Sequence, residues 1–173
     1  IRPNGAIRYG METLPPIVTR GVLLDMALAA GVDRLPRRTI FERKELREAA
    51  NRQGLDIRKG DVVLLHTGWL DMAEEDPTAF LEDTPGIGVD GAIWLADQNV
   101  VAIGADTWAI EGWPTSTGRP GQFLPVHGLL LTKRGVHILE NIHTAELARD
   151  KVYEFFFMLA APRLVGAVQS PVH

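Results

Sequence analysis

The sequence predicts an α/β protein, and three observations lead to this prediction. Two continuous apolar runs, 62–65 and 100–105, read as strands buried on both faces. Segments with helical character, 41–53 and 90–100, lie before each of these runs. No internal repeat or low-complexity segment interrupts the alternation. Because strands alternate with helices, we expect a largely parallel sheet covered by helices.

The expected elements follow in order from local signals. The first twenty residues are rich in proline and glycine, so we expect an irregular lead-in at 1–17 and a single domain at 18–173. A strand at 22–25 runs into a short helix that ends at Gly31. Thr39 is expected to cap the helix 41–53, and Gly54 to end it.

The second half of the chain continues the pattern. After the buried strand at 100–106 comes a loop, 111–121, dense in glycine, proline, serine and threonine, and loops of this length are often functional. Pro125 is suited to begin a helix and Gly135 to end it. The remaining expected elements are a strand at 136–140, a helical turn at 141–148, a strand at 152–162 and an extended piece at 164–173.

Composition excludes several classes of protein. There is no cysteine, so disulfides, thiolate zinc sites and cysteine nucleophiles are excluded. Any metal must be held by His, Asp and Glu, which favours zinc, manganese or iron. A net charge of −4 argues against a nucleic-acid or acidic-membrane partner. No apolar stretch is long enough to cross a membrane and no signal peptide is visible, so we expect a cytoplasmic protein.

The segment "PVHGLLLTKRGVHILENIHTAELA", 125–148, contains three of the five histidines. In a single helix, His137, Glu140 and His143 would spread over about 120° and could not converge on one ion. On a strand at 136–140, Glu140 and His137 point to opposite faces. A helix–turn–strand hairpin would instead bring His127 back toward Glu140. Two interpretations stay open: His127 and Glu140 form a metal-binding pair, or both are ordinary surface residues.

Three further residues have both a functional and a structural interpretation. His66 ends the first buried strand, and it is either a site residue or a structural histidine held by hydrogen bonds. Asp106 ends the second buried strand, and its carboxylate is either a ligand or a cap of the following turn. Trp108 is a candidate to pack against an aromatic substrate, or a core tryptophan. No dinucleotide-binding, P-loop or Ser–His–Asp pattern is present.

Six stretches together resemble the cyclase family of metal-dependent hydrolases, which includes bacterial kynurenine formamidase and isatin hydrolase. They are, in order, "RGVLLD", "GDVVLLHTGW", "VVAIGADTWAIE", "PVHGLLL", "GVHILEN" and "YEFFFMLAAPRLVGAVQSPV". The resemblance implies a swivelling β/β/α fold and a homo-oligomer, a dimer or tetramer. It also implies hydrolysis of an amide, lactam or ester bond of a small substrate, aromatic or N-formyl, by a metal-activated water.

The resemblance also implies site residues. The histidine of "PVH" and the glutamate of "LEN" match family metal ligands, which makes His127 and Glu140 the expected ligands of Zn or Mn. The "GADTW" stretch borders the family's active site, which supports Trp108 as a substrate contact. The family's main metal motif, H-x-G-T-H-x-D, lies upstream in relatives and does not occur in this sequence. The catalytic residues are expected in that segment.

The chain begins at Ile1 and resembles the C-terminal two-thirds of a longer enzyme, so we expect the fold to be N-terminally incomplete. Three explanations are open: the motif precedes Ile1 in nature, another chain supplies it, or the protein is inactive. Two ligands alone would leave an ion underligated, and in the last case the metal would be absent. The alternative function is a non-catalytic scaffold or binding protein that kept the fold without the motif.

Overall fold

The computed structural model describes residues 10–115 and 123–172 of the 173-residue chain. The chain divides into two compact units. One is Gly21–Phe155, and the other comprises Ile1–Arg20 together with Phe156–His173. Every residue of the sites described below belongs to the first unit. The predicted division into a lead-in and one domain from residue 18 stays a prediction.

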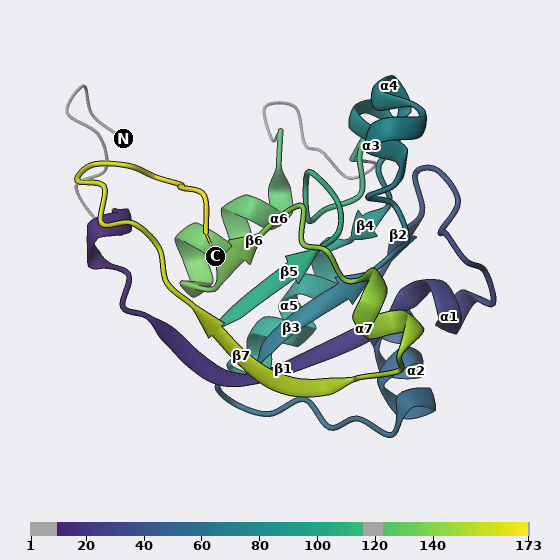
Figure 1. Ribbon diagram of the computed structural model, residues 1–173, viewed down its shortest axis with the longest axis horizontal. Helices are drawn as coiled ribbons and strands as arrows, with labels where there is room; N and C mark the ends of the chain where they lie inside the picture. Colours follow the sequence, from purple (N-terminus) through teal and green to yellow (C-terminus); the bar gives the residue numbers. More distant parts are fainter. Residues whose placement is uncertain (1–9, 116–122, 173) are drawn as a thin grey trace. The chain divides into compact units, whose positions relative to one another are not determined.

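Figure 1 shows a central sheet with helices packed around it. The main strands are β1 (Ile17–Asp25), β3 (Val62–His66), β5 (Ala102–Ala105), β6 (His137–Leu139) and β7 (Glu154–Leu159). The helices are α1 (Met26–Ala30), α2 (Arg43–Gln53), α3 (Met72–Glu75), α4 (Pro77–Glu82), α5 (Val89–Asp97), α6 (Pro125–His127) and α7 (Ala145–Arg149). Smaller elements are the 3₁₀ turn η1 (Met11–Thr13), the π-helical turn η2 (Gly128–Arg134), and a two-stranded sheet of β2 (Ile40–Phe41) and β4 (Gly86–Ile87). None of the described helices is long and apolar enough to cross a membrane.

The five-stranded sheet has the order β6-β5-β3-β1-β7. The pairs β1–β3, β3–β5 and β5–β6 are parallel. In this register Asp25 lies beside His66, and Leu65 lies beside Ala105. The predicted α/β class with a largely parallel sheet is confirmed.

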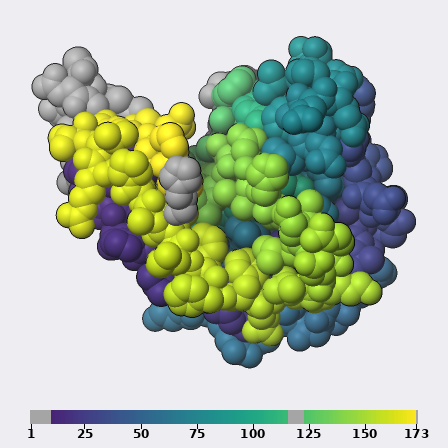
Figure 2. All heavy atoms as spheres, in the orientation of Figure 1, coloured from purple at the N-terminus to yellow at the C-terminus, as the bar shows by residue number. Residues whose placement is uncertain are grey.

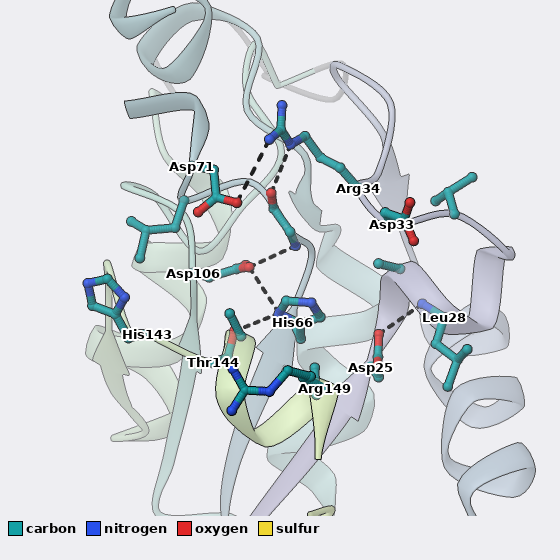
Figure 3. A pocket seen from close by; sticks show the side chains of 16 residues that line it. Asp25, Leu28, Asp33, Arg34, His66, Asp71, Asp106, His143, Thr144 and Arg149 are labelled. Carbon is teal, nitrogen blue, oxygen red and sulfur yellow. Dashed lines mark hydrogen bonds and ion pairs between the residues drawn. The ribbon is translucent and has the colours of Figure 1, made fainter. Parts of the chain in front are cut away.

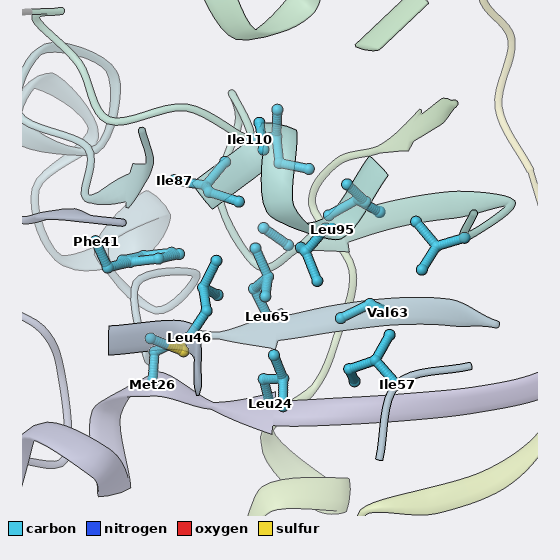
Figure 4. Close-up of a cluster of buried hydrophobic side chains, with 14 of the residues drawn as sticks. Leu24, Met26, Phe41, Leu46, Ile57, Val63, Leu65, Ile87, Leu95 and Ile110 are labelled. Atoms are coloured by element: carbon cyan, nitrogen blue, oxygen red, sulfur yellow. The ribbon is translucent and has the colours of Figure 1, made fainter. Parts of the chain in front are cut away.

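The hydrophobic core lies between the sheet and the helices α2 and α5 (Figure 4). Alternate residues of the strands face this core, such as Leu24 in β1 and Leu65 in β3. Their neighbours Leu23 and Leu64 are also buried, on the opposite face. Strands that are buried on both faces need apolar residues at every position, which is why the continuous apolar runs predicted them correctly.

Most helix ends fall where the sequence places them. Gly31, Gly54 and Gly135 end their helices with φ of 75°, 67° and 66°, the left-handed conformation that glycine adopts most easily. The helix at 125–135 begins at Pro125 as predicted, but only its first turn is α-helical and the rest is the π-helical turn η2.

The predicted cap at Thr39 is wrong. Helix α2 begins at Arg43, and its N-cap is Glu42, which forms a capping box with Glu45. The Thr39 hydroxyl instead donates to the carbonyl of Pro36 at 2.7 Å. The reason is that Ile40–Phe41 pairs with β4, which keeps the chain extended for two further residues.

A few other elements differ from the prediction. The short elements β2, β4, α3 and α4 were not predicted, because none carries a periodic apolar pattern long enough to recognise. The piece expected to be extended at 164–173 contains a turn, in which the Ala167 amide donates to the Leu164 carbonyl at 3.1 Å. In the loop predicted at 111–121, residues 116–121 lie outside the described residues.

Candidate functional site

Polar residues stand where four neighbouring strands end. Asp25 and His66 are the last residues of β1 and β3, while Asp106 and Glu140 directly follow β5 and β6. Because these strands are parallel, all four residues lie along one edge of the sheet. Ligands of open α/β sheets bind at the carboxyl ends of the strands, so a functional site is expected at this edge.

The structure brings His127 and Glu140 together. The imidazole Nε2 of His127 lies 3.1 Å from Oε1 of Glu140. The chain between them is α6, the π-helical turn and β6, which is the helix–turn–strand hairpin expected from the sequence. Their predicted juxtaposition is confirmed, and their role as metal ligands stays a prediction.

Glu111 completes this cluster, and sequence reasoning missed it. Its Oε1 lies 2.7 Å from Nδ1 of His127. The same carboxylate accepts hydrogen bonds from the backbone amides of Val126 and His127, at 3.1 and 3.0 Å. Glu111 is only 1% exposed. The sequence carries two weak signals for it: Glu111 directly follows the apolar residues Ala109 and Ile110, and it ends the family-like stretch "VVAIGADTWAIE".

The two carboxylates control the protonation of His127. Burial alone would lower the pKa of the imidazole, but its hydrogen bonds to Glu111 and Glu140 outweigh that effect. Together they raise the pKa of His127 to about 9. At neutral pH, which is below this pKa, the metal-free protein therefore favours a protonated ring between the two carboxylates.

The close approach of another strand holds Glu111 in place. A Cβ atom added at Gly86 of β4 would lie 2.4 Å from the carbonyl carbon of Glu111 and 2.5 Å from the amide nitrogen of Gly112. We expect Gly86→Ala to lower the free energy of unfolding by about 1–3 kcal/mol, because the backbone must move to admit the methyl group. Urea denaturation measures this loss.

Gly128→Ala is the matched control for that variant. Gly128 has a helical φ of −59°, and an added Cβ meets nothing within 4 Å. An alanine there is expected to be neutral or slightly stabilising. Equal stability of the two variants would contradict the close packing of β4 against Glu111.

The donor atoms fit two adjacent positions around a metal ion. With metal–ligand bonds of about 2.0–2.2 Å, neighbouring ligand atoms lie about 3 Å apart, as Nε2 of His127 and Oε1 of Glu140 do. A carboxylate on Nδ1, here Glu111, is the usual partner of a metal-bound histidine. Glu111 contacts the far nitrogen of the ring, so it orients the ligand rather than joining the ion. In residues 10–115 and 123–172, no group of three or more His, Asp or Glu side chains is arranged to hold a metal.

A cavity of about 470 Å³ opens at the carboxyl ends of β1, β3 and β5 (Figure 3). Its lining comes from the segments of α1 and α7 and from the loop after β3. Figure 2 shows the yellow-green segment of α7 and the dark blue segment of α1 on the same face. Its lining comprises Asp25, Ala27, Leu28, Val32, Asp33, Arg34, His66, Gly68, Leu70, Asp71, Asp106, His143, Thr144, Ala145, Ala148 and Arg149.

Asp106 and His66 form a hydrogen-bonded pair in this cavity. The Asp106 carboxylate accepts from the backbone amides of Thr67 and Gly68, at 3.0 and 2.8 Å, and from the Thr67 hydroxyl at 2.6 Å. Of the two interpretations of Asp106, the turn-capping one is supported in part, because the turn that this carboxylate caps follows β3 and not Asp106 itself. Nδ1 of His66 lies 2.8 Å from the Thr144 hydroxyl and 3.3 Å from Asp106, so this histidine is hydrogen-bonded. Burial lowers the pKa of His66, but Asp106 more than compensates and the net shift is upward.

Trp108 follows β5 but is not part of the cavity lining. It packs against a small cluster formed by Trp69, Met72, Ala79 and Phe80, and meets Trp113 edge to face at 6.4 Å between ring centroids. Its buried indole Nε1 has no hydrogen-bond partner among the described residues. The contact of Trp108 with a substrate stays a prediction.

Comparison with solved structures supports the predicted fold. A crystal structure described as a novel cyclase is 33% identical, with a TM-score of 0.80 over 94% of this chain and 54% of that one. Isatin hydrolase A from Ralstonia solanacearum is 20% identical, with a TM-score of 0.70 over 94% of this chain and 62% of that one. The chain thus spans little more than half the length of these relatives. The predicted fold of the cyclase type is confirmed.

A further solved structure is described as a "potential metal-dependent hydrolase with cyclase activity". It is 23% identical, with a TM-score of 0.57 over 87% of this chain and 60% of that one, and this likeness shows the fold alone. No curated protein matches the chain. The model of the Cyclase family, described as "Putative cyclase", matches residues 5–112, which is more than half of the sequence. With the 33% identity to the solved cyclase, this shows that the chain belongs to the cyclase family.

Proposed function

We propose that the protein is a metal-dependent hydrolase in which His127 and Glu140 are two of the metal ligands. The observation that carries the proposal is the 3.1 Å approach of Nε2 of His127 to Oε1 of Glu140. Membership of the cyclase family supports it, as do similar structures described as metal-dependent hydrolases. Imidazole and carboxylate ligands favour Zn or Mn.

The proposed reaction is hydrolysis of an amide, lactam or ester bond in a small substrate, as in arylformamidases. Relatives named isatin hydrolase support a cyclic aromatic substrate, and an N-formyl substrate is the other option within the family. The aromatic pair of Trp108 and Trp113 offers a surface for an aromatic ring.

The residues of this chain have distinct tasks in that reaction. Glu111 accepts a hydrogen bond from the Nδ1–H of His127 and so fixes the orientation of the ring, which would leave Nε2 to hold the ion. Glu140 supplies the adjacent oxygen and a negative charge that favours a divalent cation. When bound, the ion lowers the pKa of a water molecule and polarises the carbonyl of the substrate. Further ligands and the acid–base group are expected from the part of the relatives that this chain does not span.

A non-catalytic binding protein is the second candidate. The observation that favours it is that the described residues supply two ligands of one ion, whereas zinc sites use three or four protein ligands. This candidate keeps the fold and predicts no hydrolysis.

Metal titration tests the proposal. We expect Zn²⁺ or Mn²⁺ to bind with one ion per chain in a calorimeter, and His127→Ala and Glu140→Gln each to weaken that binding at least about tenfold. Glu82→Gln, an exposed carboxylate on α4, is the control and should leave the affinity unchanged. Unchanged affinity in both site variants would refute the metal assignment. Metal binding without hydrolysis of isatin or N-formylkynurenine would favour the binding protein.

A further inference from the structure

The cavity at the ends of β1, β3 and β5 holds a feature that the proposed hydrolase does not use. Neither His127, Glu111 nor Glu140 is part of its lining. Two of its polar side chains, Asp25 and His66, are at least nine-tenths buried, at 5% and 8% exposure. Each of them has an unused hydrogen-bonding position, which indicates a ligand.

His66 presents its Nε2 without a partner. Nδ1 is held between the Thr144 hydroxyl and the Asp106 carboxylate, which favours a proton on that nitrogen. No described residue makes a hydrogen bond to Nε2. In Figure 3 the free nitrogen of the ring lies on the side away from Thr144 and Asp106, toward Asp25. In its neutral form the ring therefore offers a lone pair to the cavity.

Asp25 is a buried carboxylate whose negative charge helps to raise the pKa of the neighbouring His66. One of its oxygens accepts from the Leu28 amide at 2.8 Å and so caps α1. It forms no ion pair with any arginine, lysine or amino terminus among the described residues. A buried carboxylate is costly unless a cation or several donors compensate it, so this position favours a positively charged partner.

The cations of the lining do not supply that charge. The Arg34 guanidinium makes two hydrogen bonds to Glu75, at 2.7 and 2.8 Å. Arg149 pairs with Asp150 at 2.9 Å. Glu75 and Asp150 lie outside the lining, and Arg34 also lies 4.0 Å from Asp71, so both arginines already have carboxylate partners. Asp25 and Asp33 then leave the cavity negative, which concentrates cations in it.

The lining of the cavity also includes apolar side chains. They are Ala27, Leu28, Val32, Leu70, Ala145 and Ala148. A volume of about 470 Å³ is within the range of small-molecule sites. The ligand should therefore combine a cationic end with a short hydrocarbon body.

We propose that this cavity binds a small primary amine. The ammonium group donates hydrogen bonds to the Asp25 carboxylate and to Nε2 of His66, with Asp33 at the entrance adding attraction. The hydrocarbon body of the amine lies against Leu28, Val32 and Leu70. The cavity residues differ from the proposed metal-binding pair. Amine binding in the cavity can therefore be tested independently of the proposed hydrolase activity.

Three molecules with the same carbon skeleton and different charges test whether the cavity prefers a cation. The probes are 3-methylbutylamine, 3-methylbutan-1-ol and 3-methylbutanoate, titrated into the full chain near pH 8, where the amine is still protonated. Backbone amide NMR signals of 66–70 and 143–148 report binding. We expect saturable shifts with the amine and at least about tenfold weaker binding of the alcohol and the acid, since a charged hydrogen bond contributes about 1.5–3 kcal/mol.

Variants identify the carboxylate responsible. Asp25→Asn should weaken amine binding at least about tenfold while still capping α1, because asparagine is also a good N-cap. Asp33→Asn, at an exposed position, should weaken amine binding about two- to threefold. Asp56→Asn, exposed and outside the cavity, is the control. The proposal is overturned if the acid binds as tightly as the amine, if no probe binds, or if Asp25→Asn binds the amine like the wild type.

Discussion

Replacement of Glu111 by alanine is expected to lower the free energy of unfolding by about 3 kcal/mol. The carboxylate is 1% exposed and accepts hydrogen bonds from two backbone amides and one imidazole. Its removal leaves the amides of Val126 and His127 without their acceptor in a buried place. Urea denaturation of the metal-free protein measures the loss.

The same variant should also weaken metal binding, about 10–100-fold, because the partner of the non-ligating ring nitrogen orients the histidine. Glu111→Gln keeps one oxygen for the backbone amides but loses the charge, so it should recover much of the stability and less of the affinity. A Glu111→Ala protein with wild-type stability and wild-type zinc affinity would show that Glu111 neither supports α6 nor positions His127.

Asp106→Ala is expected to be the most destabilising single substitution at the carboxyl edge of the sheet, by about 3–5 kcal/mol. Asp106 is 2% exposed, and the turn after β3 depends on it. Alanine would leave the amides of Thr67 and Gly68 unpaired, together with the Thr67 hydroxyl. It would also remove the carboxylate beside Nδ1 of His66.

The loss is measured by urea denaturation, with two variants for comparison. Asp106→Asn keeps one carbonyl oxygen and should lose about half as much stability. Asp97→Asn breaks an exposed pair with Arg134 and should change stability by less than about 1 kcal/mol. If Asp106→Ala were no worse than Asp97→Asn, the network at the end of β3 would not hold the turn.

The fold was largely predictable because its signals are local. A strand buried on both faces needs apolar residues at every position, and this made 62–65 and 100–105 recognisable. The glycines that end α1 and α2 have the left-handed φ that glycine favours. The cap of α2 was mispredicted because its start depends on β2 pairing with β4, across a separation of more than forty residues.

The site was predictable in part. The pair of His127 and Glu140 is separated by one hairpin, so local spacing and family resemblance were enough to propose it. Glu111 was not found, because its approach to His127 depends on β5 lying beside β6 and on the close contact at Gly86. His66 and Asp106 each had two interpretations, and only the parallel register of β3 with β5 showed that they lie together.

The sequence by itself determined the α/β class, the buried strands, several helix ends and the absence of cysteine chemistry, and it offered the pairing of His127 with Glu140 as one of two interpretations. These properties depend on composition or on residues close in the chain. Only the tertiary structure decided that Glu111 holds His127 and that Asp25 and His66 face one cavity. Such contacts join residues on different strands, and their distances are set by sheet order and register, which no local pattern contains.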